Sequence, residues 1–131
     1  MNLISANRIS LIVILFLNLI HTSSAKEIRV CNDCQPSTLS QAIAMSEDGD
    51  MIILQSGYYK EHDIVVDKQV SIIGEGNPVI DVGLKGNGIS IIKPNVLVKG
   101  LTIKNIDVNY LSELSGIKID YAENCVIEDN I

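Results

Sequence analysis

Three stretches of the chain repeat one apolar pattern, and this repeat constrains the fold more than any other feature. Each stretch begins with two apolar residues separated by one position, passes through a short polar break, and continues with a second apolar pair. The repeats begin at Ile64, Ile89 and Ile117, which gives spacings of 25 and 28 residues. Very short strands at such a period are typical of a β-solenoid, in which each rung packs only against its neighbours.

The alternation within each repeat predicts which side chains face the interior. Alternate residues of a strand point to opposite faces, so the apolar set should line the core. The residues expected to face inward are Ile64, Val66, Ile72, Ile89, Ile91, Val96, Val98, Ile103, Ile117, Ile119 and Ile127. Cys125 falls at an inward position of the third repeat, where a free cysteine behaves as a small apolar residue.

A short helix is predicted before the repeats. Residues 38–41 match a capping box, in which Thr38 and Gln41 satisfy free amides at the helix start, and Gly49 suits a left-handed C-cap. The residues expected on its buried face are Leu39, Ala42, Ile43 and Ser46. Such a helix would cover the first rung, whose apolar side chains and strand edges would otherwise be exposed.

The segments between these features are predicted to be further short strands and turns. The expected strands are 26–30, 51–54, 79–81 and 101–103, and the expected turns are 46–50, 57–59 and 74–78. The stretch 107–115 interrupts the apolar rhythm, so we expect it to leave the coil. The acidic run 46–50 is expected to be a solvated turn.

The first 25 residues predict a secretory signal peptide. Arg8 precedes a mostly apolar run over 9–20, and small residues occupy the −3 and −1 positions of a cleavage site after Ala25. An uncleaved anchor is the alternative, but the run is shorter than the roughly 20 residues that a membrane span needs. We therefore expect a periplasmic or secreted domain over 26–131. Because it would end within a rung, we expect the amino-terminal part of a longer coil.

The predicted mature part is acidic. The whole chain has a formal net charge of −6, and Arg8 is the only charged residue before Lys26. This balance argues against nucleic acid and against an anionic membrane surface as partners. It permits cationic partners, including metal ions.

Cys31 and Cys34 are the most chemically distinctive pair in the sequence. Two thiolates at this spacing could bind Cu(I), which prefers sulfur ligands. A tight local disulfide is the preferred interpretation, because an exported protein meets an oxidising compartment. A thioredoxin-like redox motif would need a βαβ context that the pattern lacks.

The remaining candidate residues have plain structural interpretations beside the functional ones. His62 lies next to Glu61 and Asp63 and is conceivable as a metal ligand, but a surface imidazole in a loop explains it as well. Met45 and Met51 are expected to pack in the core around the helix.

Paired carboxylates would indicate glycoside hydrolysis, but none of the acids forms a distinctive pair. Those considered are Asp67, Asp81, Asp107 and Asp120. Asp67 and Asp81 are expected at rung corners, and Asn105 and Asn130 at stacking or turn positions. The sequence has no Ser-His-Asp set, phosphate-binding loop or dinucleotide-binding fingerprint.

Several segments, in their order along the chain, resemble the start of NosD-type proteins. They are 38–43, 49–52, 57–59, 64–68, 72–76, 78–81, 96–103 and 116–119. That family consists of exported right-handed parallel β-helix proteins linked to copper-site assembly of nitrous oxide reductase, and they work with an ABC transporter. The resemblance implies an all-β right-handed parallel β-helix with a short capping helix. It also implies copper as a cofactor, with nitrous oxide reductase and an ABC transporter as partners.

Two other functions stay open on the same residues. Much of this series also opens other pectin-lyase-like coils, including carbohydrate-active ones, and the family's usual Asp-Gly after the 78–81 segment is here Asp81-Val82-Gly83. A polysaccharide lyase or hydrolase would need acidic or basic residues clustered on one face of the central rungs. A surface adhesion or structural β-helix without a small ligand is the third possibility.

Overall fold

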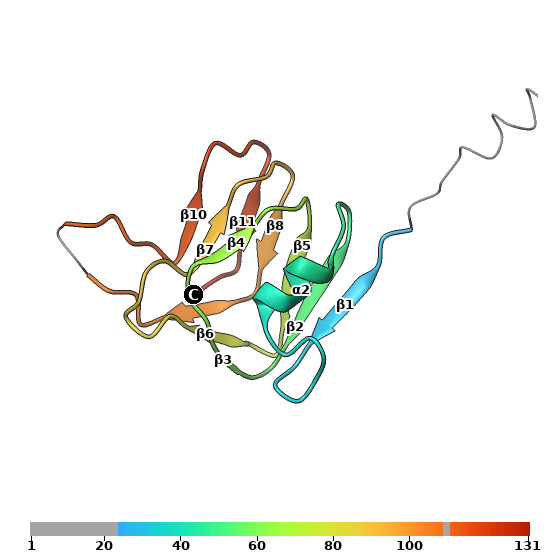
Figure 1. Cartoon of the computed structure of the whole chain (residues 1–131), viewed down its shortest axis with the longest axis horizontal. Helices are drawn as coiled ribbons and strands as arrows, with labels where there is room; N and C mark the ends of the chain where they lie inside the picture. Colours follow the sequence, from blue (N-terminus) through green and yellow to red (C-terminus); the bar gives the residue numbers. More distant parts are fainter. Residues whose placement is uncertain (1–23, 109–110) are drawn as a thin grey trace, which may run out of the picture.

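The described chain folds into a parallel β-solenoid with one short helix. The computed structural model describes residues 24–108 and 111–131 (Figure 1). The predicted leader therefore lies outside the described residues except for Ser24 and Ala25, and its cleavage stays a prediction. Within the described part, no helix is long and apolar enough to cross a membrane.

Three parallel sheets run along the coil. The five-stranded sheet has the order β1 (Glu27–Val30), β2 (Met51–Gln55), β5 (Ser71–Glu75), β8 (Leu97–Lys99) and β11 (Val126–Glu128). The second sheet contains β4 (Ile64–Val66), β7 (Ile89–Ile91) and β10 (Ile117–Ile119), with β7 in the middle. The third contains β3 (Tyr58–Lys60), β6 (Val79–Asp81) and β9 (Thr102–Lys104), with β6 in the middle. From β2 to β10, each turn of the chain adds one strand to each sheet.

The predicted register is confirmed in the first two repeats. Ile72 pairs with Val98, and Ile64 and Val66 pair with Ile89 and Ile91. The predicted inward residues that are at most 1% exposed are Ile64, Val66, Ile72, Ile89, Ile91, Val96 and Val98. Ile103 and Ile117, which were also predicted to face inward, are half-buried and pack against the core. Cys125 does the same. The core is therefore a stack of aligned aliphatic side chains.

The last rung keeps the register but not the predicted burial. Ile119 aligns with Ile91, and Ile127 aligns with Val98. Their exposed fractions are nevertheless 44% and 38%. The expectation that they would be buried was wrong, because β10 and β11 are edge strands with no described strand stacked beyond them.

The predicted helix is α2 (Leu39–Met45), and it packs against β1, β2 and β4 as a cover for the start of the coil (Figure 1). Thr38 is the N-cap, and its hydroxyl accepts a hydrogen bond from the Gln41 amide at 3.2 Å. The second half of the predicted capping box was wrong: the Gln41 side chain accepts from the Ser37 amide at 3.0 Å. The helix and its cover are confirmed.

The helix ends earlier than predicted. Its C-cap is Ser46, which bonds back to the Ile43 carbonyl, so Gly49 with φ +94° belongs to the following turn. Met45 and Met51 are 52% and 37% exposed, so their expected core packing was wrong. Met45 is the last helical residue, and Met51 begins a strand at an outward-facing position.

Two further segments differ from the sequence-based expectation. The predicted turn 57–59 is largely strand β3, and the Tyr59 ring is buried with its hydroxyl donating to the Gln55 carbonyl at 2.7 Å. In the acidic turn, Asp50 is only 6% exposed. The described part of 107–115 contains no strand, and Val108 and Leu111 there are 83% and 95% exposed, as an excursion from the coil requires.

Candidate functional site

The outer face of the third sheet carries a row of alternating charges. Lys60 on β3 pairs in register with Asp81 on β6, and Asp81 pairs with Lys104 on β9. Neighbouring strands lie about 4.8 Å apart, so the three side chains stand side by side. This parallel stacking brings together residues that are more than twenty positions apart in the sequence.

Asp81 is the centre of this cluster, and its carboxylate is fully engaged. It accepts hydrogen bonds from the Tyr58 hydroxyl, from the Gly83 amide at 2.9 Å and from the Asn105 side chain at 2.8 Å. The Lys104 ammonium lies 4.7 Å from the centre of the Tyr58 ring, a cation–π distance. Asp81 therefore lies at a rung corner, as expected, and also fixes the positions of Tyr58 and Asn105 on the surface.

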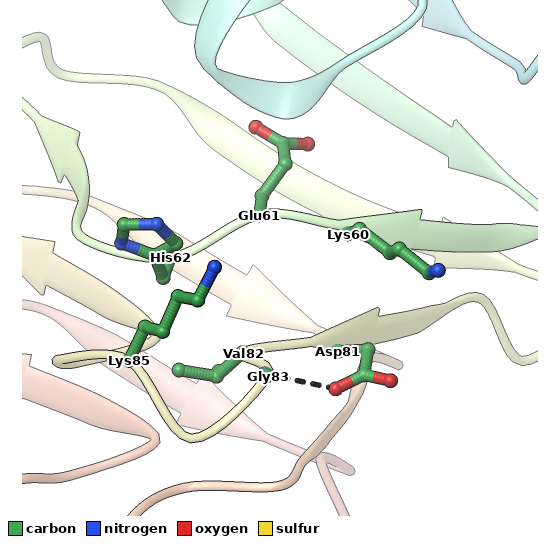
Figure 2. A pocket seen from close by; sticks show the side chains of 7 residues that line it. All are labelled: Lys60, Glu61, His62, Asp81, Val82, Gly83 and Lys85. Carbon is green, nitrogen blue, oxygen red and sulfur yellow. Dashed lines mark hydrogen bonds between the residues drawn. The ribbon is translucent and has the colours of Figure 1, made fainter.

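A hollow of about 370 Å³ opens beside the charged row (Figure 2). Its lining residues are Lys60, Glu61, His62, Asp81, Val82, Gly83 and Lys85. They come from the end of β3 and from the loop that follows β6. A hollow of this size is within the usual range for small-ligand sites.

Glu61 is turned away from the hollow toward the helix (Figure 2). One carboxylate oxygen accepts from the Leu39 amide at 2.7 Å, and the other accepts from the Ser40 amide at 3.1 Å and its hydroxyl at 2.8 Å. Free amides at a helix start need acceptors from outside the helix. Glu61 thus fastens α2 to the coil, a role that its position beside His62 did not indicate.

The two lysines of the hollow are not committed in this way. In the part of the chain that the structure describes, neither the Lys60 nor the Lys85 ammonium forms a hydrogen bond or an ion pair. Figure 2 shows the Lys85 ammonium beside His62 and below Glu61. The donors to Glu61 and Asp81 are amides and hydroxyls, so both carboxylates keep their charge, and the lining holds two carboxylates and two ammonium groups. The ammonium groups differ from the carboxylates in that their hydrogen-bonding capacity is not used by the described protein.

His62 forms a hydrogen bond with the next residue, Asp63. Its Nδ1 lies 2.9 Å from Asp63 Oδ2, and Asp63 Oδ1 accepts from the Asn87 amide at 3.0 Å. The His62 hydrogen bond, followed by the Asn87 one, lowers the pKa of Asp63 below its usual value. Among the described residues, no three His, Cys, Asp or Glu side chains gather as a metal site would require.

A second hollow, of about 320 Å³, adjoins the first. Its lining residues are Asn32, Ser37, Thr38, Tyr58, Tyr59, Lys60 and Glu61. Lys60 and Glu61 line both hollows, so the two form one strip across the end of β3. We call this strip the basic groove. It offers amide, hydroxyl and aromatic groups at one end and lysines at the other.

Cys31 and Cys34 lie at the covered end of the coil, in the loop between β1 and α2. They form a disulfide with a Cα–Cα distance of 4.9 Å. A disulfide sulfur is not a thiolate, so this form offers no copper ligand. Copper binding by the reduced pair stays a prediction.

The other candidate polar residues lie apart from the basic groove, except for Asn105. Asp67 is exposed at the corner after β4, and Asp120 pairs with Lys118 at 3.1 Å. Asp107 is half-buried in the excursion. Asn130 accepts from the Leu101 amide at 2.9 Å and donates to the Val98 carbonyl at 3.0 Å, which is the stacking role expected for it.

The basic groove was missed in the sequence because β3 was read as a turn. With β3 in place, Tyr58-x-Lys60, Val79-x-Asp81 and Thr102-x-Lys104 occupy equivalent outward positions in successive rungs. That shared spacing was the available signal for the charged row.

Comparison with known proteins gives one distant relative. The chain is 27% identical over 106 residues to a protein named Pectate lyase L from Thermoclostridium stercorarium. The match covers 72% of this chain and 8% of that protein. No family model matches the chain, and no solved structure matches it. The parallel coil and this similarity together support a pectin-lyase-like β-helix, and nothing in them is specific to the NosD family.

Proposed function

We propose that this chain is an exported β-helix module that binds an acidic polysaccharide along the basic groove. The observation that carries the proposal is the state of the charges there. The carboxylates of Glu61 and Asp81 accept hydrogen bonds from other groups of the protein. The ammonium groups of Lys60 and Lys85 have no partner among the described residues. A carboxylate on a ligand would supply acceptors for these two ammonium groups.

The rest of the groove suits a chain of sugars. Asn32, Ser37 and Thr38 offer polar groups to sugar hydroxyls, and Tyr58 offers an aromatic ring held between Lys104 and Asp81. The relative's name refers to pectate, an acidic polysaccharide, and this supports the choice of ligand class. We propose binding and not hydrolysis, because the described groove has no pair of uncommitted carboxylates for acid–base work.

The test is a binding measurement with polygalacturonate as the probe and a neutral polysaccharide as the control. The double variant Lys60→Gln with Lys85→Gln should lose about tenfold in affinity or more, since charge-assisted hydrogen bonds are lost. Binding of the native protein should also weaken as salt is added.

A matched control removes two lysines elsewhere. Lys93→Gln with Lys118→Gln changes the net charge equally, but Lys93 lies in the loop after β7 and Lys118 lies on β10 of the second sheet. Their removal should leave the affinity nearly unchanged. Equal losses in both double variants, or no binding by the native protein, would show that the groove is not a polysaccharide site.

The NosD resemblance supplies a second candidate, copper delivery to nitrous oxide reductase together with an ABC transporter. The observation that favours it is the Cys31–Cys34 disulfide, because its reduction would leave two thiols side by side. When reduced, the pair would offer two soft ligands of the kind that Cu(I) prefers. The reduced protein should then take up Cu(I), and Cys31→Ser with Cys34→Ser should abolish uptake.

A further inference from the structure

The first strand begins against a buried carboxylate. Asp50 is 6% exposed, and its Oδ1 accepts a hydrogen bond from the backbone nitrogen of Lys26 at 2.9 Å. Its Oδ2 accepts from the Glu47 amide at 2.8 Å. Both oxygens of this carboxylate are therefore held by the backbone.

Lys26 is also the residue that follows the predicted cleavage site. Ser24, Ala25 and Lys26 are exposed and precede β1, so the peptide bond after Ala25 lies at the surface. Hydrolysis there adds water across the Ala25–Lys26 bond. The carboxylate leaves with the leader, and the Lys26 nitrogen becomes an ammonium group.

We propose that this cleavage converts the Lys26–Asp50 hydrogen bond into an ion pair, so that Asp50 is the binding site for the new amino terminus. The proposal depends on export and cleavage after Ala25 and is independent of polysaccharide binding. No movement of the chain is required, because the nitrogen is already at hydrogen-bonding distance from the carboxylate.

The surroundings of Asp50 are suited to a cation. In the described chain no ammonium or guanidinium group lies within ion-pair distance of it, although the Lys26 side chain attracts it from further away. Glu47 and Asp48 belong to the same turn, and Asp48 accepts from the Gln69 amide. The Lys68 ammonium, on the neighbouring corner, donates a hydrogen bond to the Ile43 carbonyl at 2.9 Å.

The two backbone hydrogen bonds, first that of Glu47 and then that of Lys26, hold the pKa of Asp50 below its usual value. The carboxylate is thus ionised at neutral pH. An ammonium in contact with it should have its own pKa raised above the usual value near 8. Stability from this pair is present below about pH 8 and is lost as the pH rises through the raised value.

The test begins with the full chain expressed with its leader in a bacterial export host. The mass of the purified product should correspond to a chain starting at Lys26. The pKa of its terminal amino group, followed by the pH dependence of amine labelling at that group, should lie toward 9 or above. Asp50→Asn should return this value to near 8, whereas Asp48→Asn, in the same turn, should not.

Asp50→Asn also alters two backbone contacts and could prevent folding. A second variant avoids this problem by inserting one glutamine between Ala25 and Lys26, which keeps Ala25 as the small residue before the cleavage site, places the new ammonium one residue away and leaves Asp50 intact. Its terminal amino pKa should also be near 8, and its melting temperature below that of the native product. A product starting elsewhere, or a native amino pKa near 8, would overturn the proposal.

Discussion

The two ends of the coil have the same strand register but opposite surroundings. At the start, α2 lies over β4, and Leu39, Ile52 and Ile64 are at most 1% exposed. At the last rung, Ile119 lies in the column of the buried Val66 and Ile127 in the column of Ile52, and they are 44% and 38% exposed. The side chains at both ends are of the same type.

This difference separates two things that the repeat specifies. Register follows from the alternation within each strand, so it is the same in every rung. Burial depends on a neighbour on both sides, so it fails wherever a rung lacks one. The same substitution should therefore have very different costs along one column of the stack.

The largest effect is expected at the centre of the second sheet. Ile91 is fully buried between Val66 and Ile119, so Ile91→Asp loses about 1.5–3 kcal/mol of apolar burial and also buries an unpaired charge. With total stability of about 5–15 kcal/mol for a typical domain, we expect loss of folding. Circular dichroism and denaturant unfolding measure this.

Ile119→Asp is the matched comparison, because it places the same carboxylate in the same column one rung later. Its side chain is already 44% exposed, so the charge keeps contact with water and the protein should still fold. Equal damage from the two substitutions would refute the contrast between the central and the last rung.

A smaller loss is expected from opening the covered end. Leu39 is fully buried at the start of α2, and Leu39→Ala should lower the free energy of unfolding by about 2–5 kcal/mol through lost contacts and a cavity. Met45→Ala, at the exposed end of the same helix, should cost far less. Urea unfolding of both variants compares them. If Leu39→Ala hardly changed the free energy of unfolding, the helix would not stabilise the end that it covers.

The disulfide belongs to the same covered end. We predict that thiol titration of the exported protein finds Cys31 and Cys34 blocked until reductant is added. Closure of so short a loop contributes about 2 kcal/mol by the chain-entropy model, so Cys31→Ser with Cys34→Ser should lower stability by about that amount. Cys125→Ser is a control with the same chemistry at a half-buried position. Free, copper-loaded thiols in protein taken directly from the periplasm would contradict this prediction.

Much of the fold could be predicted from local patterns. The repeats set the strands and their register, and the Thr38 cap with its apolar face set the helix, because these signals lie within a few residues of each other. Most errors arose where the partner of a group lies far away in the sequence. The helix start takes its remaining acceptors from Glu61, some twenty residues downstream. The hydrogen bond between Gln41 and Ser37, four residues apart, is a local exception.

The basic groove was missed for a related physical reason. Lys60, Asp81 and Lys104 become neighbours only through parallel stacking of β3, β6 and β9, and the first of these strands had been assigned as a turn. The free or engaged state of each charge depends on hydrogen bonds from other rungs. Composition suggested an acidic surface, whereas the groove exposes lysines.

The smallest effect is expected at Glu61, which joins the covered end to the groove. Glu61→Gln keeps the shape of the side chain but replaces one acceptor oxygen with a donor, so one of the amides of Leu39 and Ser40 loses its partner. The free energy of unfolding should fall by about 1 kcal/mol, as for other lost helix caps. Glu113→Gln, at an exposed position in the excursion, should have almost no effect. Because Glu61 turns toward the helix and the substitution removes a negative charge from the groove lining, polygalacturonate affinity should stay at or rise above the native value. A variant of native stability that binds polygalacturonate poorly would instead place Glu61 in the polysaccharide site and remove it from the helix cap.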